Sequence, residues 1–298
     1  MRIFLTGATG YIGGSVAAGL VAAGHRVRGL VRSEARADKL RARGIEPVIG
    51  TLDDGELLAE AARQADAVIN AANADHRPAA EAMLAALAGS GKVFLHTSGS
   101  SIVGTRAKGE ATDAIFDETT SFEPSPARAA RVALNRDILA AAETGVRAVI
   151  VCPSLIYGLG RGLAPHSMQV PWLIALARKQ GVARHIGPGG NIWSHVQIDD
   201  LLDLYLLALD KAPAGAFYFA ESGEASMREV CQAINRMLGI AGEPQSMTLE
   251  EAATEWGEGP ANDTMASNSR VRAKRARAEL GWAPHRRSLA EEIAAITR

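Results

Sequence analysis

The chain of 298 residues holds only two cysteines, Cys152 and Cys231. Two cysteines cannot form a disulfide framework, and they show no metal-ligand spacing. The seven histidines are scattered and form no HxxxH motif. These absences exclude a small disulfide-rich fold and predict no metal site, and a reducing, cytosolic setting is the simplest interpretation.

Excess charge and long apolar runs are also missing. The chain has 33 acidic and 32 basic residues. This balance gives no reason to expect nucleic acid as a partner. No apolar run approaches the ~20 residues of a membrane span, so we expect no membrane partner. MRIFLTG leads directly into an apolar strand pattern, which predicts no signal peptide.

The most informative stretch present is RIFLTGATGYIGG, residues 2–14. A short apolar run is followed by glycines three apart, Gly7, Gly10 and Gly13, and then by helix-forming residues. The order indicates a strand, a tight turn and a helix, an arrangement that brings backbone N–H groups and a helix N-terminus to one point and suits a pyrophosphate. Gly7 can adopt positive φ, Gly10 allows close approach of a phosphate, and Gly13 allows the helix to pack on the strand.

The spacing GxxGxxG, with the words TGATGYIG, resembles the extended and atypical short-chain dehydrogenase/reductase families, which include the sugar-nucleotide epimerases and dehydratases. The resemblance extends over nearly the whole chain. It implies a dinucleotide cofactor, a small-molecule substrate and a fold that the remaining pattern can test, and it is compatible with a homodimer.

The expected second strand spans residues 27–31 and is followed by Arg32 and Ser33, with Arg36 one helical turn later. A carboxylate at this place would bond the adenosine ribose and repel a 2′-phosphate, whereas a guanidinium pairs with a phosphate. We therefore expect NADP, with NAD as the alternative. Relatives carry Asp-Leu after the third strand, and this chain has Thr51-Leu52.

Further strands are expected at 47–50, 66–72, 92–98, 147–151 and 216–220, with helices between them. This alternation predicts an α/β fold, a Rossmann-type doubly wound parallel sheet with a smaller C-terminal substrate domain. We expect the cofactor domain at 1–155, also recruiting about 195–220, and the substrate domain at 156–298. The predicted cofactor-binding residues are Gly7, Thr9, Gly10, Tyr11, Ile12, Gly13, Arg32, Thr51, Leu52, Ala71, Ala72, Asn73, Thr97, Ser98, Arg131, Pro153, Ser154 and Leu155.

In relatives, the catalytic residues are a Ser or Thr after the fifth strand and a Tyr and a Lys four residues apart on the next helix. Aligned with that pattern, Gly99 takes the hydroxyl position, Ala127 the tyrosine position and Arg131 the lysine position. Alanine cannot transfer a proton. The resemblance therefore implies a non-standard catalytic centre, or a protein that binds the cofactor without the usual chemistry.

We assign the proton transfer to His195, the orientation of the substrate to Ser100, and a supporting role to Arg131. Histidine titrates near neutrality and can act in either direction. The alternative for His195, a core histidine bonded to backbone, is at least as well supported. A third possibility gives a chemical role to Tyr157, which is usually structural in relatives.

The C-terminal half contains several segments with weaker signals. Asn191 stands where relatives use an arginine to bind a nucleotide diphosphate, which argues against a nucleotide-sugar substrate. Asp199 and Asp200 resemble a catalytic acid pair, but a helix N-terminus explains them better. Residues 243–266 are polar and are expected to be irregular, as in a flap. The basic stretch 270–281 is expected to be a solvated helix face.

Two functions fit these observations. One is an NADP-binding oxidoreductase or epimerase/dehydratase-like enzyme that acts on a small non-nucleotide substrate. The other is a catalytically inactive, NAD(P)-sensing regulator of the NmrA type. We favour the enzyme because the C-terminal substrate domain is complete.

Overall fold

The structure, a computed structural model, describes residues 1–296. Its centre is a parallel sheet in the order β12-β8-β5-β4-β1-β2-β3. The strands are β1 (Arg2–Thr6), β2 (Arg26–Val31), β3 (Glu46–Ile49), β4 (Ala67–Asn70), β5 (Val93–Thr97), β8 (Arg147–Pro153) and β12 (Ala216–Ala220). The order reverses beside β1, which is the Rossmann arrangement. The predicted fold class is confirmed, and the sheet contains the seven strands expected from the sequence.

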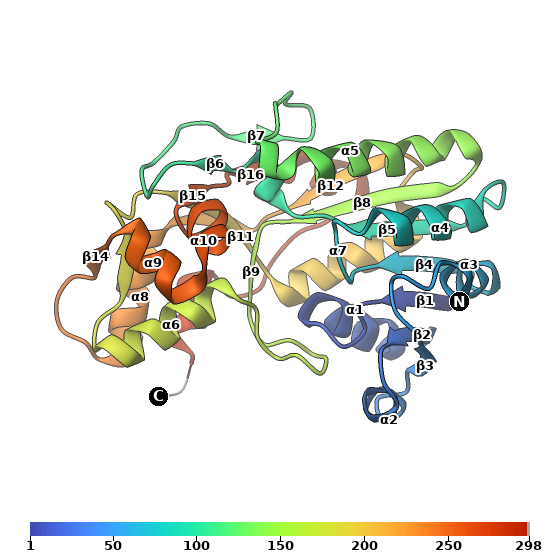
Figure 1. Cartoon of the computed structure of the whole chain (residues 1–298), viewed down its shortest axis with the longest axis horizontal. Coiled ribbons are helices and arrows are strands. Elements are labelled where there is room, and N and C mark those ends of the chain that lie inside the picture. Colours follow the sequence, from blue (N-terminus) through green and yellow to red (C-terminus); the bar gives the residue numbers. More distant parts are fainter. Residues whose placement is uncertain (297–298) are drawn as a thin grey trace.

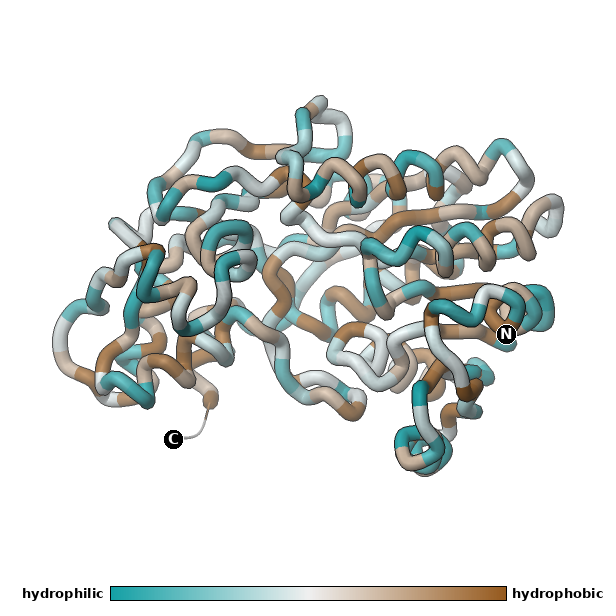
Figure 2. The backbone as a smooth tube through the Cα atoms, viewed as in Figure 1, coloured by the Kyte–Doolittle hydropathy of each residue, from teal (hydrophilic) through white to brown (hydrophobic). Residues whose placement is uncertain are grey.

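Helices connect and cover these strands (Figure 1). They are α1 (Tyr11–Ala22), α2 (Glu34–Arg41), α3 (Gly55–Gln64), α4 (Arg77–Leu87), α5 (Pro126–Ala140) and α7 (Ile198–Lys211). Helix α1 packs against α7, whereas α3 packs against α4 and α4 against α5. The central strands β4 and β5 are buried along their whole length because helices cover both faces of the sheet (Figure 2). β2 and β3, at one edge, begin with the exposed charged residues Arg26 and Glu46.

The second region lies at the left in Figure 1. Its sheet has the order β13 (Gly223–Ser226), β11 (Ile192–Gln197) and β9 (Leu155–Tyr157), and β10 (Arg184–Ile186) pairs with β14 (Gln245–Met247). Its longer helices are α6 (Gln169–Gln180), α8 (Met227–Leu238), α9 (Leu249–Trp256) and α12 (Leu289–Ala294). No helix within residues 1–296 is both long and apolar enough to cross a bilayer.

The remaining elements are short. They are the 3-10 turns η1 (Ser100–Val103) and η2 (Ala141–Thr144), the strands β6 (Thr105–Arg106), β7 (Phe116–Asp117), β15 (Ser267–Asn268) and β16 (Val271–Arg272), the helices α10 (Glu258–Pro260) and α11 (Lys274–Leu280), and the π-helical turn η3 (Ala261–Met265). β15 pairs with β6, and β16 pairs with β7. The C-terminal part of the chain is therefore tied to the loop that follows β5.

The buried apolar residues form two clusters. The larger one contains the seven-stranded sheet and its helices, including residues 196–220 and 271–282, and the smaller one lies within residues 155–293. This grouping supports the proposed division into a cofactor domain and a substrate domain. It adds the α11 region to the cofactor side.

Two sequence expectations about the C-terminal region were wrong. Residues 243–266 are not irregular, because a capping box of Thr248 and Glu251 starts α9 and short helical turns follow it. The basic stretch is not only a solvated face. Arg270 and Arg272 pair with Glu224, and Arg277 pairs with Glu221, so these charges attach the C-terminal segment to its neighbours.

Candidate active site

The glycine turn between β1 and α1 is tightly packed against the end of β4. Gly7 has φ of +80°, and a Cβ on it would lie 2.5 Å from the carbonyl oxygen of Ala71. A Cβ on Gly13 would overlap the Gly7 carbonyl. At Gly10, in contrast, the nearest atom would be the Gly7 oxygen at 3.3 Å. Gly10 therefore faces open space, beside the free N–H groups at the start of α1.

A cavity of about 590 Å³ opens in front of this turn. It is lined by Gly7, Thr9, Gly10, Leu30, Val31, Arg32, Arg36, Thr51, Leu52, Asp53, Ala71, Ala72, Asn73 and His76. The structure thus brings together most of the residues predicted for the adenosine and pyrophosphate. Arg32 directly follows β2, and Arg36 lies on α2. Arg36 Nη1 donates to Thr9 Oγ1 at 3.3 Å.

The remaining predicted cofactor residues fall into two groups. Tyr11 and Ile12 open α1, and the Tyr11 hydroxyl donates to the Gly158 carbonyl. Thr97, Ser98, Pro153, Ser154 and Leu155 follow or end β5 and β8, and all five are buried. Thr97 Oγ1 lies 2.5 Å from the Tyr205 hydroxyl, Ser98 Oγ accepts from Asn135 Nδ2, and Ser154 Oγ donates to the Ala220 carbonyl. Their side chains are therefore held in the interior at the carboxyl ends of β5 and β8.

Arg131 lies beside the loop after β5, as the alignment predicted. Its Nε and Nη2 donate to the two carboxylate oxygens of Asp75 at 2.7 and 2.5 Å, and its Nη1 donates to Ser101 Oγ at 3.4 Å. The same Nη1 would lie 3.6 Å from a Cβ on Gly99. A fixed guanidinium thus stands next to an accessible hydroxyl, and its charge together with this bonding lowers the pKa of the Asp75 carboxyl.

Asp75 and Ser101 escaped the sequence analysis. Asp75 lies five residues beyond the end of β4, in a loop that matches no motif. Its one sequence signal was that an acidic residue stands two positions after Asn73, a predicted cofactor residue. Ser101 was passed over because Ser98 and Ser100 flank the aligned Gly99. In the turn η1, Ser101 is half-buried and Ser100 is buried.

The structure does not bring Ser100 and His195 together. Ser100 is 1% exposed, and its Oγ accepts a hydrogen bond from Ser269 Oγ at 2.8 Å. His195 lines a different cavity, of about 500 Å³, between α8, α12 and β13, and no predicted cofactor residue is among its lining residues. Burial lowers the pKa of His195 to about 4, and its ring stacks edge-on against Tyr157.

Asn191 and Tyr157 are both part of the framework. The Asn191 side chain is fully buried and its Nδ2 donates to the carbonyls of Met265 and Ser267 at 2.9 and 2.8 Å. The Tyr157 hydroxyl donates to the Arg287 carbonyl. Asn191 therefore offers no donor for a diphosphate, in contrast to an arginine.

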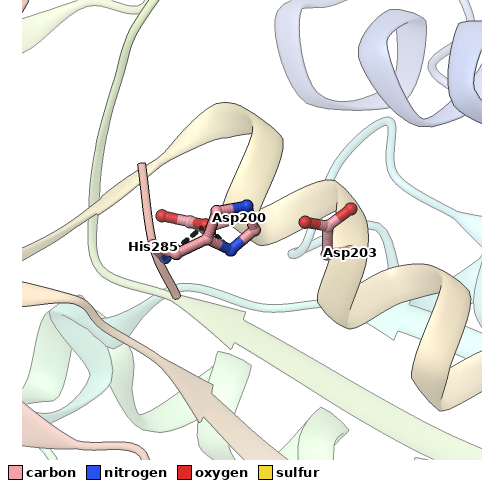
Figure 3. Close-up of side chains that lie close together, drawn as sticks. All are labelled: Asp200, Asp203 and His285. Carbon is pink, nitrogen blue, oxygen red and sulfur yellow. Dashed lines mark hydrogen bonds and ion pairs between the residues drawn. The ribbon is translucent and has the colours of Figure 1, made fainter. Parts of the chain in front are cut away.

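Asp200 joins α7 to the C-terminal segment (Figure 3). Its carboxylate is 1% exposed and accepts the backbone N–H groups of His285 and Arg286 at 3.0 and 3.2 Å. Asp200, Asp203 and His285 are the one group within residues 1–296 whose atoms are close enough to hold a metal. Because the Asp200 oxygens are already bonded to backbone, the group is explained as a structural joint. Asp199, the other acid of the pair, binds Arg161.

Comparison with known proteins agrees with this geometry. The profile of the NAD dependent epimerase/dehydratase family matches residues 3–218. The chain is 33% identical over 338 residues to the oxidase ucsJ of Acremonium sp., covering 100% of this chain and 97% of the relative. It is 28% identical to a 4-hydroxy-2-methyl-3-oxo-4-farnesyl-3,4-dihydroquinoline-1-oxide ketoreductase of Stigmatella aurantiaca, over 85% of this chain and 78% of the relative.

Among solved structures, dTDP-glucose 4,6-dehydratase of Bacillus anthracis in complex with NAD superposes with a TM-score of 0.78 at 18% identity, covering 99% of this chain and 94% of the other. This likeness shows the fold. Together with the family profile and the named relatives, it shows that the chain belongs to the NAD-dependent epimerase/dehydratase family, as an NAD(P)-dependent enzyme of the oxidoreductase and epimerase/dehydratase type.

Proposed function

We propose that the protein is an NADP-dependent oxidoreductase that interconverts a carbonyl group and an alcohol on a small, non-nucleotide substrate. The observation that carries this proposal is the cavity in which the glycine turn faces Arg32 and Arg36. No carboxylate stands at Val31–Ser33 to bond an adenosine ribose or to repel a 2′-phosphate.

The residues present fit this cofactor. The first N–H groups of α1 and the absent Cβ at Gly10 leave room and donors for a pyrophosphate. The guanidinium groups of Arg32 and Arg36 suit a 2′-phosphate. When bound, NADP supplies or accepts a hydride.

The substrate is proposed to lack a nucleotide because Asn191 is buried and bonded to Met265 and Ser267. A diphosphate needs paired cationic donors. The ketoreductase relative acts, by its name, on a ketone that is not a nucleotide sugar. A small carbonyl compound is the substrate class that fits both observations.

Ser101 and Arg131 replace the absent tyrosine and lysine in this proposal. Arg131 donates to Ser101 Oγ, so the Ser101 hydroxyl is free to donate a hydrogen bond to the substrate oxygen, and the proton that this oxygen takes up comes from water. The positive charge of Arg131, fixed by Asp75, stabilises negative charge that develops on that oxygen. This pair replaces Ser100 and His195, the residues first assigned to the reaction. Ser100 is buried and bonded to Ser269, and His195 lines a separate cavity.

A screen of NADPH oxidation against aldehydes, ketones and imines tests this function. We expect turnover with at least one carbonyl compound, and a fall in kcat of ~10²-fold in Ser101→Ala, the usual scale for loss of one hydrogen-bond donor to a developing oxyanion. Ser121→Ala, an exposed serine beside another cavity, is the matched control. Binding of NADPH without turnover of any compound would instead favour a nucleotide-sensing regulator.

A further inference from the structure

Arg128 lies on α5 three residues before Arg131, so the two side chains leave the same face of the helix. Its side chain is partly exposed, and it takes part in no hydrogen bond or ion pair with any residue of the described part of the chain. Arginine has five N–H donors and stays charged, so a partly buried guanidinium without a partner needs an explanation.

The charged groups around Arg128 are already paired with one another. Arg131 binds Asp75, and Arg106 binds Asp263 through Nε–Oδ1 and Nη2–Oδ2 contacts of 2.6 and 3.3 Å. These four groups are the ones that interact electrostatically with the Arg128 guanidinium. Each pair sums to zero charge. The positive charge of Arg128 therefore remains uncompensated at this place.

Burial makes that charge costly. The pKa of Arg128 lies below its usual value, chiefly because burial disfavours the charged form and secondly because of the positive charge of Arg131. An anion at this place would return both a charge and hydrogen bonds to the guanidinium. The planar fork of arginine suits a carboxylate, which it can bind through two parallel bonds.

The position of Arg128 connects this anion to the reacting centre. One turn further along α5, Arg131 reaches Ser101, where the proposed function puts the substrate oxygen. On the other side, Arg106 and Asp263 belong to β6 and η3, which join the two regions of the molecule. A substrate held between the regions would therefore meet Ser101 and Arg128 at neighbouring places, because Arg128 and Arg131, which bonds Ser101, are neighbours on the helix surface.

We propose that Arg128 binds the carboxylate of the substrate, and that the substrate is an oxo acid whose keto oxygen lies at Ser101. The proposal rests on the proposed oxidoreductase function and adds the substrate class. It makes Arg128 the residue that selects the acid over its neutral derivatives.

The experiment compares 3-oxooctanoate with its methyl ester as substrates for NADPH oxidation. We expect the ratio of kcat/KM for the acid to kcat/KM for the ester to fall ~10- to 100-fold in Arg128→Gln, the scale of one lost charge-assisted bond. Arg128→Lys should keep part of the preference because it keeps the charge. Arg136→Gln, on the same helix but beside a separate cavity with Glu118 and Phe122, should keep all of it.

Binding of octanoate to the NADPH-saturated protein, followed by ligand-observed NMR, gives a readout that needs no turnover. Octanoate should bind to the wild type and to Arg136→Gln, and not to Arg128→Gln. An unchanged acid-to-ester ratio with unchanged octanoate binding in Arg128→Gln would overturn the role of Arg128 and leave the reductase function standing. A loss of NADPH affinity in Arg128→Gln with octanoate binding retained would overturn it too, because Arg128 would then contact the cofactor.

If no carbonyl compound is reduced, the proposed function fails, and the octanoate measurement alone decides on Arg128. Binding that depends on Arg128 would then support an anion site, and binding that does not would reject it.

Discussion

Arg131 stands at the helix position that the resemblance assigns to lysine, but a guanidinium binds its surroundings differently from an ammonium. Its planar fork takes both oxygens of Asp75 and leaves one nitrogen for Ser101. This bonding fixes the arginine without a tyrosine at position 127. The pair of Arg131 and Ser101 therefore gives the site a charge and a hydroxyl, by a route that differs from the usual pair.

In the proposed function, the preference for NADP over NAD depends on Arg32. It lines the cavity at the end of β2, where a 2′-phosphate would lie. Arg32→Ala should weaken NADPH binding ~10- to 100-fold, the effect of losing one charge-assisted pair, and leave NADH binding nearly the same. Calorimetric titration of both cofactors measures this. Arg26→Ala, at the exposed start of the same strand, is the control, and equal affinity of the wild type for the two cofactors would refute the preference.

Single residues differ in how far the sequence determined them. The roles of Gly7 and Gly13 followed from spacing, because only glycine fits positive φ or such a close approach. The choice between Ser100 and Ser101 could not follow, because both neighbour Gly99 in sequence. Only the course of η1 and the distant contact with Ser269 decide which hydroxyl is buried.

At the scale of elements, the end of the chain depends on its attachment to α7. Asp200 binds two backbone N–H groups of the segment after α11, and Trp282 Nε1 donates to the Asp200 carbonyl at 2.8 Å. The buried carboxylate is the second part of the joint, and a helix N-terminus alone does not account for it.

Asp200→Asn should lower the free energy of unfolding by ~1–3 kcal/mol, because hydrogen bonds from buried N–H groups to a charged acceptor are lost or weakened. Urea unfolding measures the change, and trypsin cleavage after Arg286 or Arg287 should become faster. Asp203→Asn is the matched control, since Asp203 is 40% exposed and meets Arg286 only at 3.5 Å. Equal effects of the two substitutions would contradict the joint.

Elements with a regular pattern were predictable and short ones were not. The central strands of the main sheet are largely apolar runs between helices, which the alternation of the sequence makes plain. Helix α2 was expected only from the alternation of strands and helices, because EARADKLR has just two buried residues, Ala37 and Leu40, and so carries little apolar periodicity. Helix α9 was missed because its signal is the local capping box of Thr248 and Glu251 within a polar stretch.

At the scale of the whole molecule, each of the two buried clusters is associated with a buried histidine. His96 lies in the main sheet, where its Nδ1 meets Asn70 Nδ2 and Asn70 Oδ1 accepts from Thr6, and His195 lies under α8 and α12. Burial lowers the pKa of each to about 4. The unfolded chain, with values near 6.5, binds more protons between these limits, so stability is complete above pH ~6.5 and is lost as the pH falls toward 4.

Urea unfolding at pH 7 and pH 5 should therefore show a loss of ~2 kcal/mol for each histidine. His96→Asn should remove the part of this loss in unfolding free energy that comes from His96, whether or not the substitution changes stability at pH 7. His166→Asn, at an exposed loop position, should leave the loss as it is. A pH dependence that is the same in the wild type and in His96→Asn would show that His96 does not resist protonation.

The arrangement of the two regions explains what the sequence could not supply about the site. The glycine turn, the end of β2 and the residues directly after β4 each lie within or next to a local sequence motif, so the sequence could predict their place in the site. Arg106 and Asp263 come together through the pairing of β6 with β15, strands that are more than a hundred residues apart in sequence. Contacts of that range have no local pattern, so the sequence could not predict this part of the proposed site.

The central claim, a dinucleotide bound at the glycine turn, is tested most directly by calorimetric titration of NADPH into the wild type and Gly10→Val. A Cβ at Gly10 would meet only the Gly7 oxygen within the protein, at 3.3 Å, so we expect the variant to fold and melt close to the wild type. The valine would occupy the space of the pyrophosphate. We expect clear binding to the wild type and none to Gly10→Val; near-equal affinity of the two would contradict the account.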